Sequence, residues 1–223
     1  MNINLIGTMP KNGISGGRLL SWLLAESLAI SGIEVSYITN NKPAFYKDFS
    51  DFSRVKLNIC IHYPNSFICK LKKRLNIKIV PNILIEKIPQ ADYTVIVPQL
   101  DNVKLHQKFL EVAQKTSQKI VLLNFETPNW FNSLSPLKRD ENRWNGWKVI
   151  AERADLILSI SRESNKYAKI FYTKLKKMYD LIITIHLLII LLQIKLKKGK
   201  AEKDKLFVYR VWIHTKVWMI LLI

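Results

Sequence analysis

The first 172 residues alternate between short apolar runs of strand length and longer amphipathic stretches of helix length. This alternation is typical of a parallel sheet with helices on both faces. We therefore predict an α/β fold with a Rossmann-like parallel sheet over residues 1–172. The predicted strands are Asn2–Gly7, Ile33–Thr39, Lys56–Ile61, Lys78–Pro81, Asp92–Val97, Lys119–Phe125 and Asp155–Ile160. The predicted helices are Gly17–Ser31, Val103–Ser117, Arg139–Ala154 and Ser161–Phe171, the last capped by Ser161.

The first of these helices has the clearest pattern. Leucines recur at intervals that place them on one helical face, and Gly32 follows at the position where a glycine commonly ends a helix. We expect that face to pack on the sheet. Its members are Leu20, Leu23, Leu24 and Leu28.

Composition narrows the class of protein. Apolar residues make up 48% of the chain, which is enough for a core and excludes disorder along its whole length. Two cysteines, Cys60 and Cys69, cannot build a disulfide scaffold or a four-cysteine zinc site. The N-terminus has no basic region before an apolar stretch, so we expect no signal peptide and a cytoplasmic location.

The charge is strongly positive, with 35 Lys and Arg against 17 Asp and Glu and a net charge of +18. Clustered basic residues commonly serve phosphate contacts in nucleic-acid-binding proteins. They also face anionic lipid, and the cluster at Lys70, Lys72, Lys73 and Arg74 lies among apolar residues. No zinc-finger, RRM or basic-zipper pattern accompanies the charge, and we expect no nucleic-acid partner. A basic nucleic-acid-binding domain is the least favoured of the alternative functions. A solvated basic face is the third interpretation of the cluster.

Residues 173–223 have a different character, being apolar and basic with one glycine and no proline. The apolar run Leu181–Ile194 would span about 21 Å as a helix, which is short of the roughly 30 Å of a bilayer core. We expect this tail not to be a native domain. A membrane anchor is the alternative, and it would make the chain a membrane-associated α/β binding module.

The junction between the first strand and the first helix carries a glycine pair, Gly16 and Gly17, preceded by Ser15. The N-terminal N–H groups of a helix lack intrahelical partners and carry a partial positive charge. Glycine lets a ligand approach them, so the loop suits a phosphate or a sugar hydroxyl. The spacing fits neither the dinucleotide fingerprint nor the P-loop. A tight turn with no ligand is the alternative.

Three motifs in this order resemble the N-terminal domain of the retaining GT-B glycosyltransferases of the family-4-like group, glycosyltransferase group 1. The first is the loop glycine pair. The second is Gly32-Ile33-Glu34-Val35, which is similar to the family's G-H-E-V with Ile33 in place of His. The third is residues 151–161, AERADLILSIS, which resembles the strand that closes the family's first domain. The resemblance covers residues 1–172.

The resemblance implies transfer of a sugar, with retention, from a nucleotide-sugar donor to a glycan or lipid-linked acceptor, with no metal or other cofactor. It implies that Ser15, Gly16 and Gly17 lie near the donor phosphates. It also implies that Glu126 and Asn129 line the acceptor side, although a turn cap and a solvated carboxylate are the simpler interpretations of these two residues. Their place after a predicted strand is the edge where open α/β folds bind ligands.

Aromatic and histidine residues give weaker signals. Tryptophans can stack on sugars, but at helical spacing they more often belong to the core. The residues in question are Trp130, Trp144 and Trp147. The four histidines are scattered, with no pair at metal-ligand spacing, so we expect no metal site.

The tail is consistent with a shifted reading frame. Read one frame back, the dipeptides Trp212-Ile213, Trp218-Met219 and Met219-Ile220 each force an Asp codon, and residues 212–221 permit D-T-Y-K-G-L-D-D-I-I. Preceded by a permitted S-R-L, this resembles the phosphate-binding segment that opens the family's donor domain. We therefore expect a truncated chain that lacks the donor-side cations and is inactive, since charge stabilisation is often the largest catalytic contribution. Association with the inner face of the membrane is the alternative to a freely cytoplasmic location.

Overall fold

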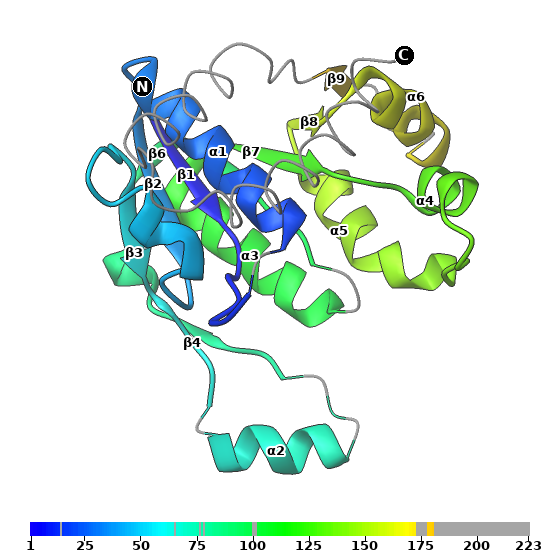
Figure 1. Cartoon of the computed structure of the whole chain (residues 1–223), viewed down its shortest axis with the longest axis horizontal. Coiled ribbons are helices and arrows are strands. Elements are labelled where there is room, and N and C mark those ends of the chain that lie inside the picture. Colours follow the sequence, from blue (N-terminus) through cyan, green and yellow to red (C-terminus); the bar gives the residue numbers. More distant parts are fainter. Residues whose placement is uncertain are drawn as a thin grey trace, which may run out of the picture. The chain divides into compact units, whose positions relative to one another are not determined.

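The computed structural model describes residues 1–13, 15–64, 66–75, 77, 79–99, 102–172 and 178–180. Its centre is a seven-stranded parallel sheet in the order β3-β2-β1-β6-β7-β8-β9 (Figure 1). The strands are β1 Asn2–Ile6, β2 Glu34–Thr39, β3 Lys56–Ile59, β6 Ala91–Ile96, β7 Ser117–Asn124, β8 Leu156–Ser159 and β9 Met178–Asp180. A separate antiparallel pair is formed by β4 Ile61–His62 and β5 Asn82–Ile83. The predicted Rossmann-like α/β fold is confirmed.

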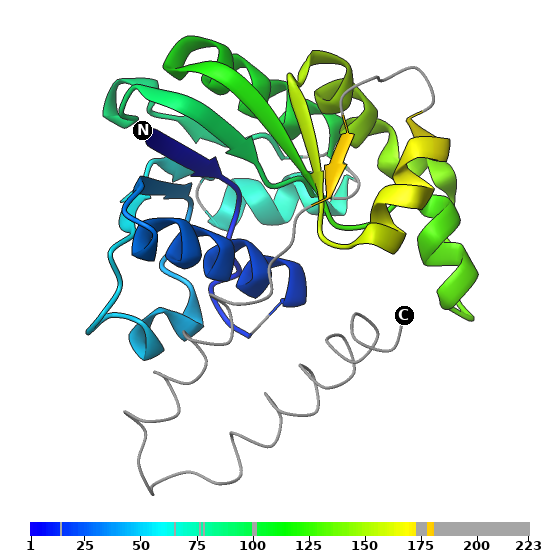
Figure 2. The same cartoon turned by 90° about the horizontal axis from the view of Figure 1, so that it is seen from above.

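The helices lie in the connections between strands. They are α1 Gly16–Ile30, α2 Ser66–Arg74, α3 Val103–Thr116, α4 Pro128–Leu134, α5 Asn145–Arg153 and α6 Arg162–Phe171. Three short 3₁₀ turns, η1 Ala44–Asp48, η2 Ile85–Lys87 and η3 Glu141–Trp144, lie between them. Figure 2 shows α1 on one side of the sheet and α3 on the other. Both faces of the sheet are therefore covered.

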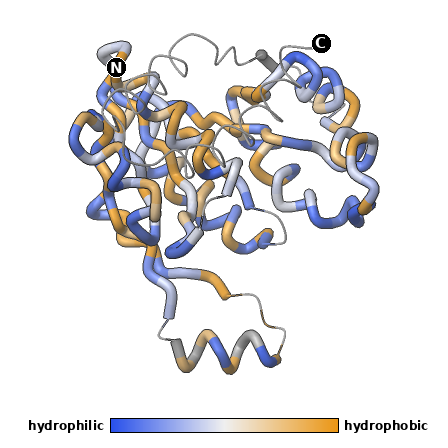
Figure 3. Tube along the Cα trace, in the orientation of Figure 1, coloured by the Kyte–Doolittle hydropathy of each residue, from blue (hydrophilic) through white to orange (hydrophobic). Residues whose placement is uncertain are grey.

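The strand register explains why both faces must be covered. Leu5 lies between Tyr37 and Val95 in the register of neighbouring strands, and all three are buried. The next row, centred on Ile6 between Ile38 and Ile96, has no exposed surface and belongs to the core cluster that includes α3 and α5. Successive strand residues point to opposite faces, so two apolar rows require two layers of helices. Figure 3 shows the apolar residues along these strands.

Helix α1 packs differently from the predicted leucine face. Leu23 and Leu24 are buried as expected, but Leu20 and Leu28 are only half-buried. The centre of the contact is Trp22, which is fully buried with its ring centroid 5.4 Å from that of Tyr37. An indole buries more apolar area than a leucine. Helix α1 therefore packs on the sheet with the face that carries Trp22.

The ends of the helices agree in part with the predictions. Gly32, with φ of +87°, follows α1, and its N–H and that of Ile33 bond to the carbonyls of Ala29 and Leu28, respectively. These two bonds form a Schellman motif. Ser161 caps α6 by accepting the N–H of Ser164 at 3.0 Å, as predicted. The predicted helix Arg139–Ala154 instead begins at Asn145, after η3.

Two further differences concern short segments. Ile79–Pro81 are not in a strand, and the pairing with β4 occurs at Asn82–Ile83 instead. Helix α4 was not predicted, because it is short. A helix at the basic cluster of residues 70–74 was one of the interpretations left open, and α2 forms there. Apart from β9, which pairs with β8, the predicted tail 173–223 lies outside the described residues, and so does the anchor Leu181–Ile194.

Candidate functional site

The sheet order fixes where a ligand can bind. With the β4–β5 pair set aside, the first six strands lie in the order 3-2-1-4-5-6 of the doubly wound fold. The chain leaves β1 toward β2 on one side and later returns to place β6 on the other side. The crevice beyond the carboxyl ends of β1 and β6 is the point where open α/β sheets bind ligands.

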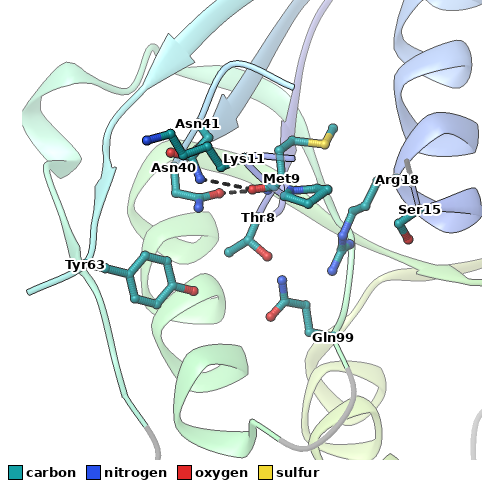
Figure 4. A pocket seen from close by; sticks show the side chains of 10 residues that line it. Thr8, Met9, Lys11, Ser15, Arg18, Asn40, Asn41, Tyr63 and Gln99 are labelled. Carbon is teal, nitrogen blue, oxygen red and sulfur yellow. Dashed lines mark hydrogen bonds between the residues drawn. The ribbon is translucent and has the colours of Figure 1, made fainter. Parts of the chain in front are cut away.

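An open cavity of about 390 Å³, lined mainly by polar residues, lies at this point (Figure 4). Its lining comes from the loops after β1, β2, β4 and β6 and from the first turn of α1. The lining residues are Thr8, Met9, Pro10, Lys11, Ser15, Arg18, Asn40, Asn41, Tyr63 and Gln99. They include two cations and no carboxylate. The volume is in the range of small-molecule sites.

The loop after β1 is held in shape by two asparagines that follow β2. The side-chain oxygen of Asn40 accepts the backbone N–H of Met9 at 2.7 Å. The side-chain nitrogen of Asn41 donates to the Met9 carbonyl at 3.2 Å. Met9 is therefore fixed on both sides of its backbone, and the strand ends of β1 and β2 act as one rigid rim.

The opposite rim is held by buried side chains of α3 and α5. The backbone N–H of Gln99 donates to Nε2 of His106 at 2.9 Å, and the carbonyl of Gln99 accepts from the indole Nε1 of Trp147 at 3.2 Å. Burial, with a further contribution from the positive charge of Arg18, lowers the pKa of His106 to about 4. The imidazole is therefore neutral at pH 7, as acceptance of the Gln99 N–H at Nε2 requires.

Arg18 is the main charge of the cavity. Its side chain is only 9% exposed, and it reaches from α1 toward Thr8 and Gln99 (Figure 4). It donates to the Pro98 carbonyl at 3.4 Å. Burial lowers its pKa, although the neighbouring Tyr37 and Tyr63 work in the opposite direction. An arginine still stays protonated in proteins, so the cavity contains a buried positive charge.

The predicted phosphate loop is partly in this cavity. Ser15 is in the lining, makes no capping hydrogen bond with its side chain, and directly precedes the start of α1 at Gly16. Gly17 lies close to the β7 end of the sheet, because a Cβ added to it would lie 3.8 Å from the ring of Phe125. No acidic residue lies in the first turn of α1. The positive end of the helix is thus not neutralised locally.

The predicted acceptor-side residues lie elsewhere and have protein partners. Oε1 of Glu126 accepts from NH1 of Arg139 at 3.2 Å. Asn129 accepts from the Thr127 hydroxyl and the Trp130 N–H and donates to the Tyr167 carbonyl. Neither side chain lines the cavity, and a role for either in acceptor binding stays a prediction.

Of the three tryptophans singled out in the sequence, Trp144 and Trp147 are buried, which favours their place in the core. Trp130 is half-buried and does not line the cavity. Cys60 and Cys69 are free thiols. Within the described ranges, no three His, Cys, Asp or Glu side chains come together as metal ligands.

No helix in the described part of the chain is both long enough and apolar enough to cross a bilayer.

Sequence reasoning missed most of the residues that line the cavity. A usable signal existed, because Thr8, Asn40 and Gln99 are polar residues just beyond the ends of buried strands. Arg18 directly follows the glycine pair. The sequence did not show that these residues converge, since that depends on which strands are neighbours.

The fold and the cavity define the chain as a Rossmann-like α/β domain with a cationic polar cavity at its topological switch point. No family model matches the chain, and no curated protein matches it. Among solved structures it is similar to a sucrose-phosphate synthase from Thermosynechococcus elongatus, with 14% identity and a TM-score of 0.44. That match covers 88% of this chain and 97% of the other. At this TM-score the match supports no conclusion about function.

Proposed function

We propose that this chain is the acceptor-side lobe of a retaining GT-B glycosyltransferase that takes a sugar from a nucleotide-sugar donor. The observation that supports this most is the cavity at the carboxyl ends of β1 and β6, where Ser15 of the glycine-pair loop and Arg18 lie together. The three sequence motifs of residues 1–172 point to the same class of enzyme.

In this proposal the lobe binds and does not catalyse by itself. The N-terminus of α1 and Arg18 face the anionic part of the ligand. Polar groups of Asn41 and Tyr63 lie on the side of the cavity away from α1 (Figure 4). A glycan or lipid-linked acceptor would approach from the side of Glu126 and Asn129. Charge stabilisation of the leaving diphosphate would come from a second lobe, so in this proposal residues 1–172 bind the donor without transferring its sugar.

The proposal is tested with the purified full chain and a panel of nucleotide sugars that includes UDP-glucose and GDP-mannose. Ligand-observed NMR measures binding, and nucleotide release in the presence of acceptor sugars measures turnover. We expect weak binding that perturbs the amides of Ser15–Gly17, with no turnover. Turnover by the full chain would overturn the inactivity. Absence of binding by every donor and acceptor would overturn the assignment to this class of enzyme.

Gly17 offers a matched pair of variants for this test. A Cβ at Gly17 would make only ordinary contact with Phe125, so Gly17→Ala is expected to fold. Gly17→Asp would place a negative charge in the first turn of α1, where it would oppose an anionic ligand at the positive end of the helix. We expect it to abolish nucleotide-sugar binding while Gly17→Ala weakens binding less. Equal binding by both variants would place the ligand elsewhere.

A second candidate function, docking on an anionic membrane, is favoured by α2. Phe67, Leu71 and Leu75 recur at a spacing of four residues and are 73%, 49% and 62% exposed. Lys70 and Arg74 are exposed beside them, and the helix sequence contains no acidic residue. Exposed apolar side chains flanked by lysine and arginine suit the interface of a bilayer that contains anionic lipid.

Vesicle sedimentation tests this second function. We expect the full chain to sediment with phosphatidylglycerol-containing vesicles more than with pure phosphatidylcholine vesicles. The double variant Phe67→Ser with Leu71→Ser should reduce this binding, whereas Leu137→Ser, at a leucine that is 78% exposed elsewhere, should not. Full binding by the double variant would exclude α2 as the docking surface.

A further inference from the structure

Arg18 poses an energetic problem. A buried cation that no opposite charge balances costs several kcal/mol, and buried charges are normally paired. Among the residues described, no carboxylate forms an ion pair with Arg18, and its bond to the Pro98 carbonyl is long at 3.4 Å. A guanidinium has five N–H donors, so one long bond leaves most of its capacity unused.

Thr8 poses a second, independent problem. Its side chain is 4% exposed, and its hydroxyl has no hydrogen-bond partner among the described residues. An unsatisfied buried hydroxyl is costly. Thr8 lies among Tyr63, Gln99 and Arg18 in the wall of the same cavity (Figure 4). Two unrelated elements, the β1 loop and α1, therefore direct unused donors to one place.

The third contribution is the start of α1, a helix of 15 residues. Its first intrahelical bond joins the Leu19 N–H to the Ser15 carbonyl at 2.9 Å. The N–H groups before Leu19 precede the first hydrogen-bonded turn, where a helix has no acceptor of its own. Neither a side-chain cap nor an acidic residue compensates this end.

We propose that Arg18 and Thr8, with the N-terminus of α1, form a binding site for one phosphate group of the ligand. A bound phosphate would balance the Arg18 charge and accept the Thr8 hydroxyl proton. Donors that converge from a guanidinium, a hydroxyl and a helix end match the several oxygens of a tetrahedral phosphate better than the two oxygens of a planar carboxylate. The absence of Asp and Glu from the cavity lining favours an anion of either kind.

The cavity is larger than one phosphate needs, so the phosphate belongs to a larger molecule. A phosphorylated sugar acceptor and the diphosphate of a nucleotide are the two sources. The phosphate site itself rests on Arg18 and Thr8, and only this choice of sources rests on the proposed function.

The test is a titration of the ¹⁵N-labelled full chain at constant ionic strength, with inorganic phosphate, glucose 6-phosphate, UDP and acetate in separate arms. We expect phosphate-bearing ligands to shift the Thr8 amide and the Arg18 side-chain Nε–H resonance, and acetate to shift them much less. Tighter binding of glucose 6-phosphate than of UDP identifies a phosphorylated acceptor, and the reverse identifies the nucleotide. Equal affinity for acetate would overturn the phosphate assignment.

Variants separate binding from folding. We expect Arg18→Met to weaken phosphate binding by about 10- to 100-fold and Thr8→Val by about 3- to 10-fold. Because each removes an unsatisfied buried group, neither should lower the Tm measured without phosphate. Arg153→Met, the same substitution at an exposed arginine outside the cavity, should leave binding unchanged. A lowered Tm of Arg18→Met together with an unchanged phosphate affinity would make Arg18 purely structural and overturn the proposal.

The two proposals fail in different ways. Phosphate binding that depends on Arg18 and Thr8, without tighter binding of any sugar phosphate or nucleotide, would keep the phosphate site and reject the glycosyltransferase lobe. Nucleotide-sugar binding that is insensitive to Arg18→Met and Thr8→Val would keep the lobe and reject the phosphate site.

Discussion

The imidazole of His106 accepts the backbone N–H of Gln99, with 2.9 Å between Nε2 and N, and so fixes the β6 side of the cavity from within the core. His106 has no exposed surface. Protonation of Nε2 would remove this acceptor and place a second positive charge near Arg18. The geometry of the cavity thus depends on a neutral histidine.

This relationship predicts how stability changes with pH. A free histidine takes up its proton near pH 6.5, whereas the pKa of His106 in the folded chain is about 4. Between these values the unfolded chain binds more protons, so the free energy of unfolding decreases as pH falls from about 6.5 to about 4. The loss from this group is up to about 3 kcal/mol. Urea unfolding at a series of pH values measures it.

A pair of histidine variants isolates the effect. His106→Gln should flatten the slope of stability against pH in this window. His62→Gln, at an exposed histidine, should leave the slope as it is. An unchanged slope in His106→Gln would assign the pH dependence to other groups.

Gly146 is predicted to be essential for packing against His106. A Cβ at Gly146 would lie 2.0 Å from Nδ1 and 2.7 Å from Cε1 of that ring, and the ring is buried and cannot move aside. Gly146→Ala should therefore destabilise the chain by about 1–3 kcal/mol or more. Thermal or urea unfolding measures the loss.

Two controls accompany Gly146→Ala. Gly17→Ala adds the same methyl group where it meets Phe125 at an ordinary 3.8 Å, and it should have a small effect on stability. In a His106→Ala background the obstacle is gone, so Gly146→Ala should cost less than it does in the parent chain. Additive effects of the two substitutions would argue against a direct clash.

Glu26 is predicted to destabilise the folded chain at neutral pH. It is 1% exposed, and neither carboxylate oxygen makes a hydrogen bond of good geometry in the described part of the chain, although Ser53, the Arg54 backbone and the Trp22 side chain lie close enough to act against the effect of burial on its pKa. Burial raises its pKa above 4.5. The unfolded chain therefore loses this proton first, and the contribution of Glu26 to stability declines as pH rises above about 4.5. Its effect opposes that of His106.

Glu26→Gln should accordingly raise the Tm at pH 7.5, because it removes the buried charge and keeps the shape. The gain should shrink toward pH 4, where the parent carboxyl is protonated. Glu111→Gln, at an exposed glutamate of α3, serves as the control and should change little. A lower Tm of Glu26→Gln at pH 7.5 would show that the carboxylate has a stabilising partner.

Asn129 is predicted to stabilise the packing of α4 against α6. Its side chain accepts from Thr127 at 2.6 Å and from the Trp130 N–H at 3.1 Å, and it donates to the Tyr167 carbonyl at 3.3 Å. Asn129→Ala should cost about 1–3 kcal/mol, since it leaves these groups without partners. Asn129→Asp keeps both acceptor contacts but sets a carboxylate oxygen against the Tyr167 carbonyl, so it should cost a similar amount.

The Asn129 pair also tests the predicted acceptor role. If Asn129 only stabilises the fold, both variants bind acceptors in proportion to the fraction that is folded. A loss of acceptor affinity in Asn129→Asp at full folding would assign it to the ligand.

Local features of this protein could be predicted from the sequence because they depend on neighbouring residues. Gly32 ends α1 because a residue without Cβ adopts the positive φ of the Schellman motif at no steric cost. Ser161 caps α6 because its hydroxyl reaches an N–H three residues ahead. Apolar runs such as Ile120–Leu123 indicated strands that are covered on both faces.

Other features depended on contacts between distant segments. The predicted leucine face of α1 was wrong in part because Trp22 meets Tyr37 and Phe45, which belong to later segments. The helix predicted from Arg139 starts later because the Asp140 side chain accepts the Asn142 N–H and caps a 3₁₀ turn first. Periodicity alone does not contain either contact.

The alternation of strands and helices, the glycine pair at the start of α1 and the polar residues that follow the strands can all be read from the order of the residues. The position of β6 beside β1 cannot, because it depends on how the whole sheet assembles. That pairing brings Gln99 to the same cavity as Thr8 and Arg18, although Gln99 is distant from both in the sequence. The physical reason is that strand order is set by how two apolar faces are buried together, and no local pattern records it.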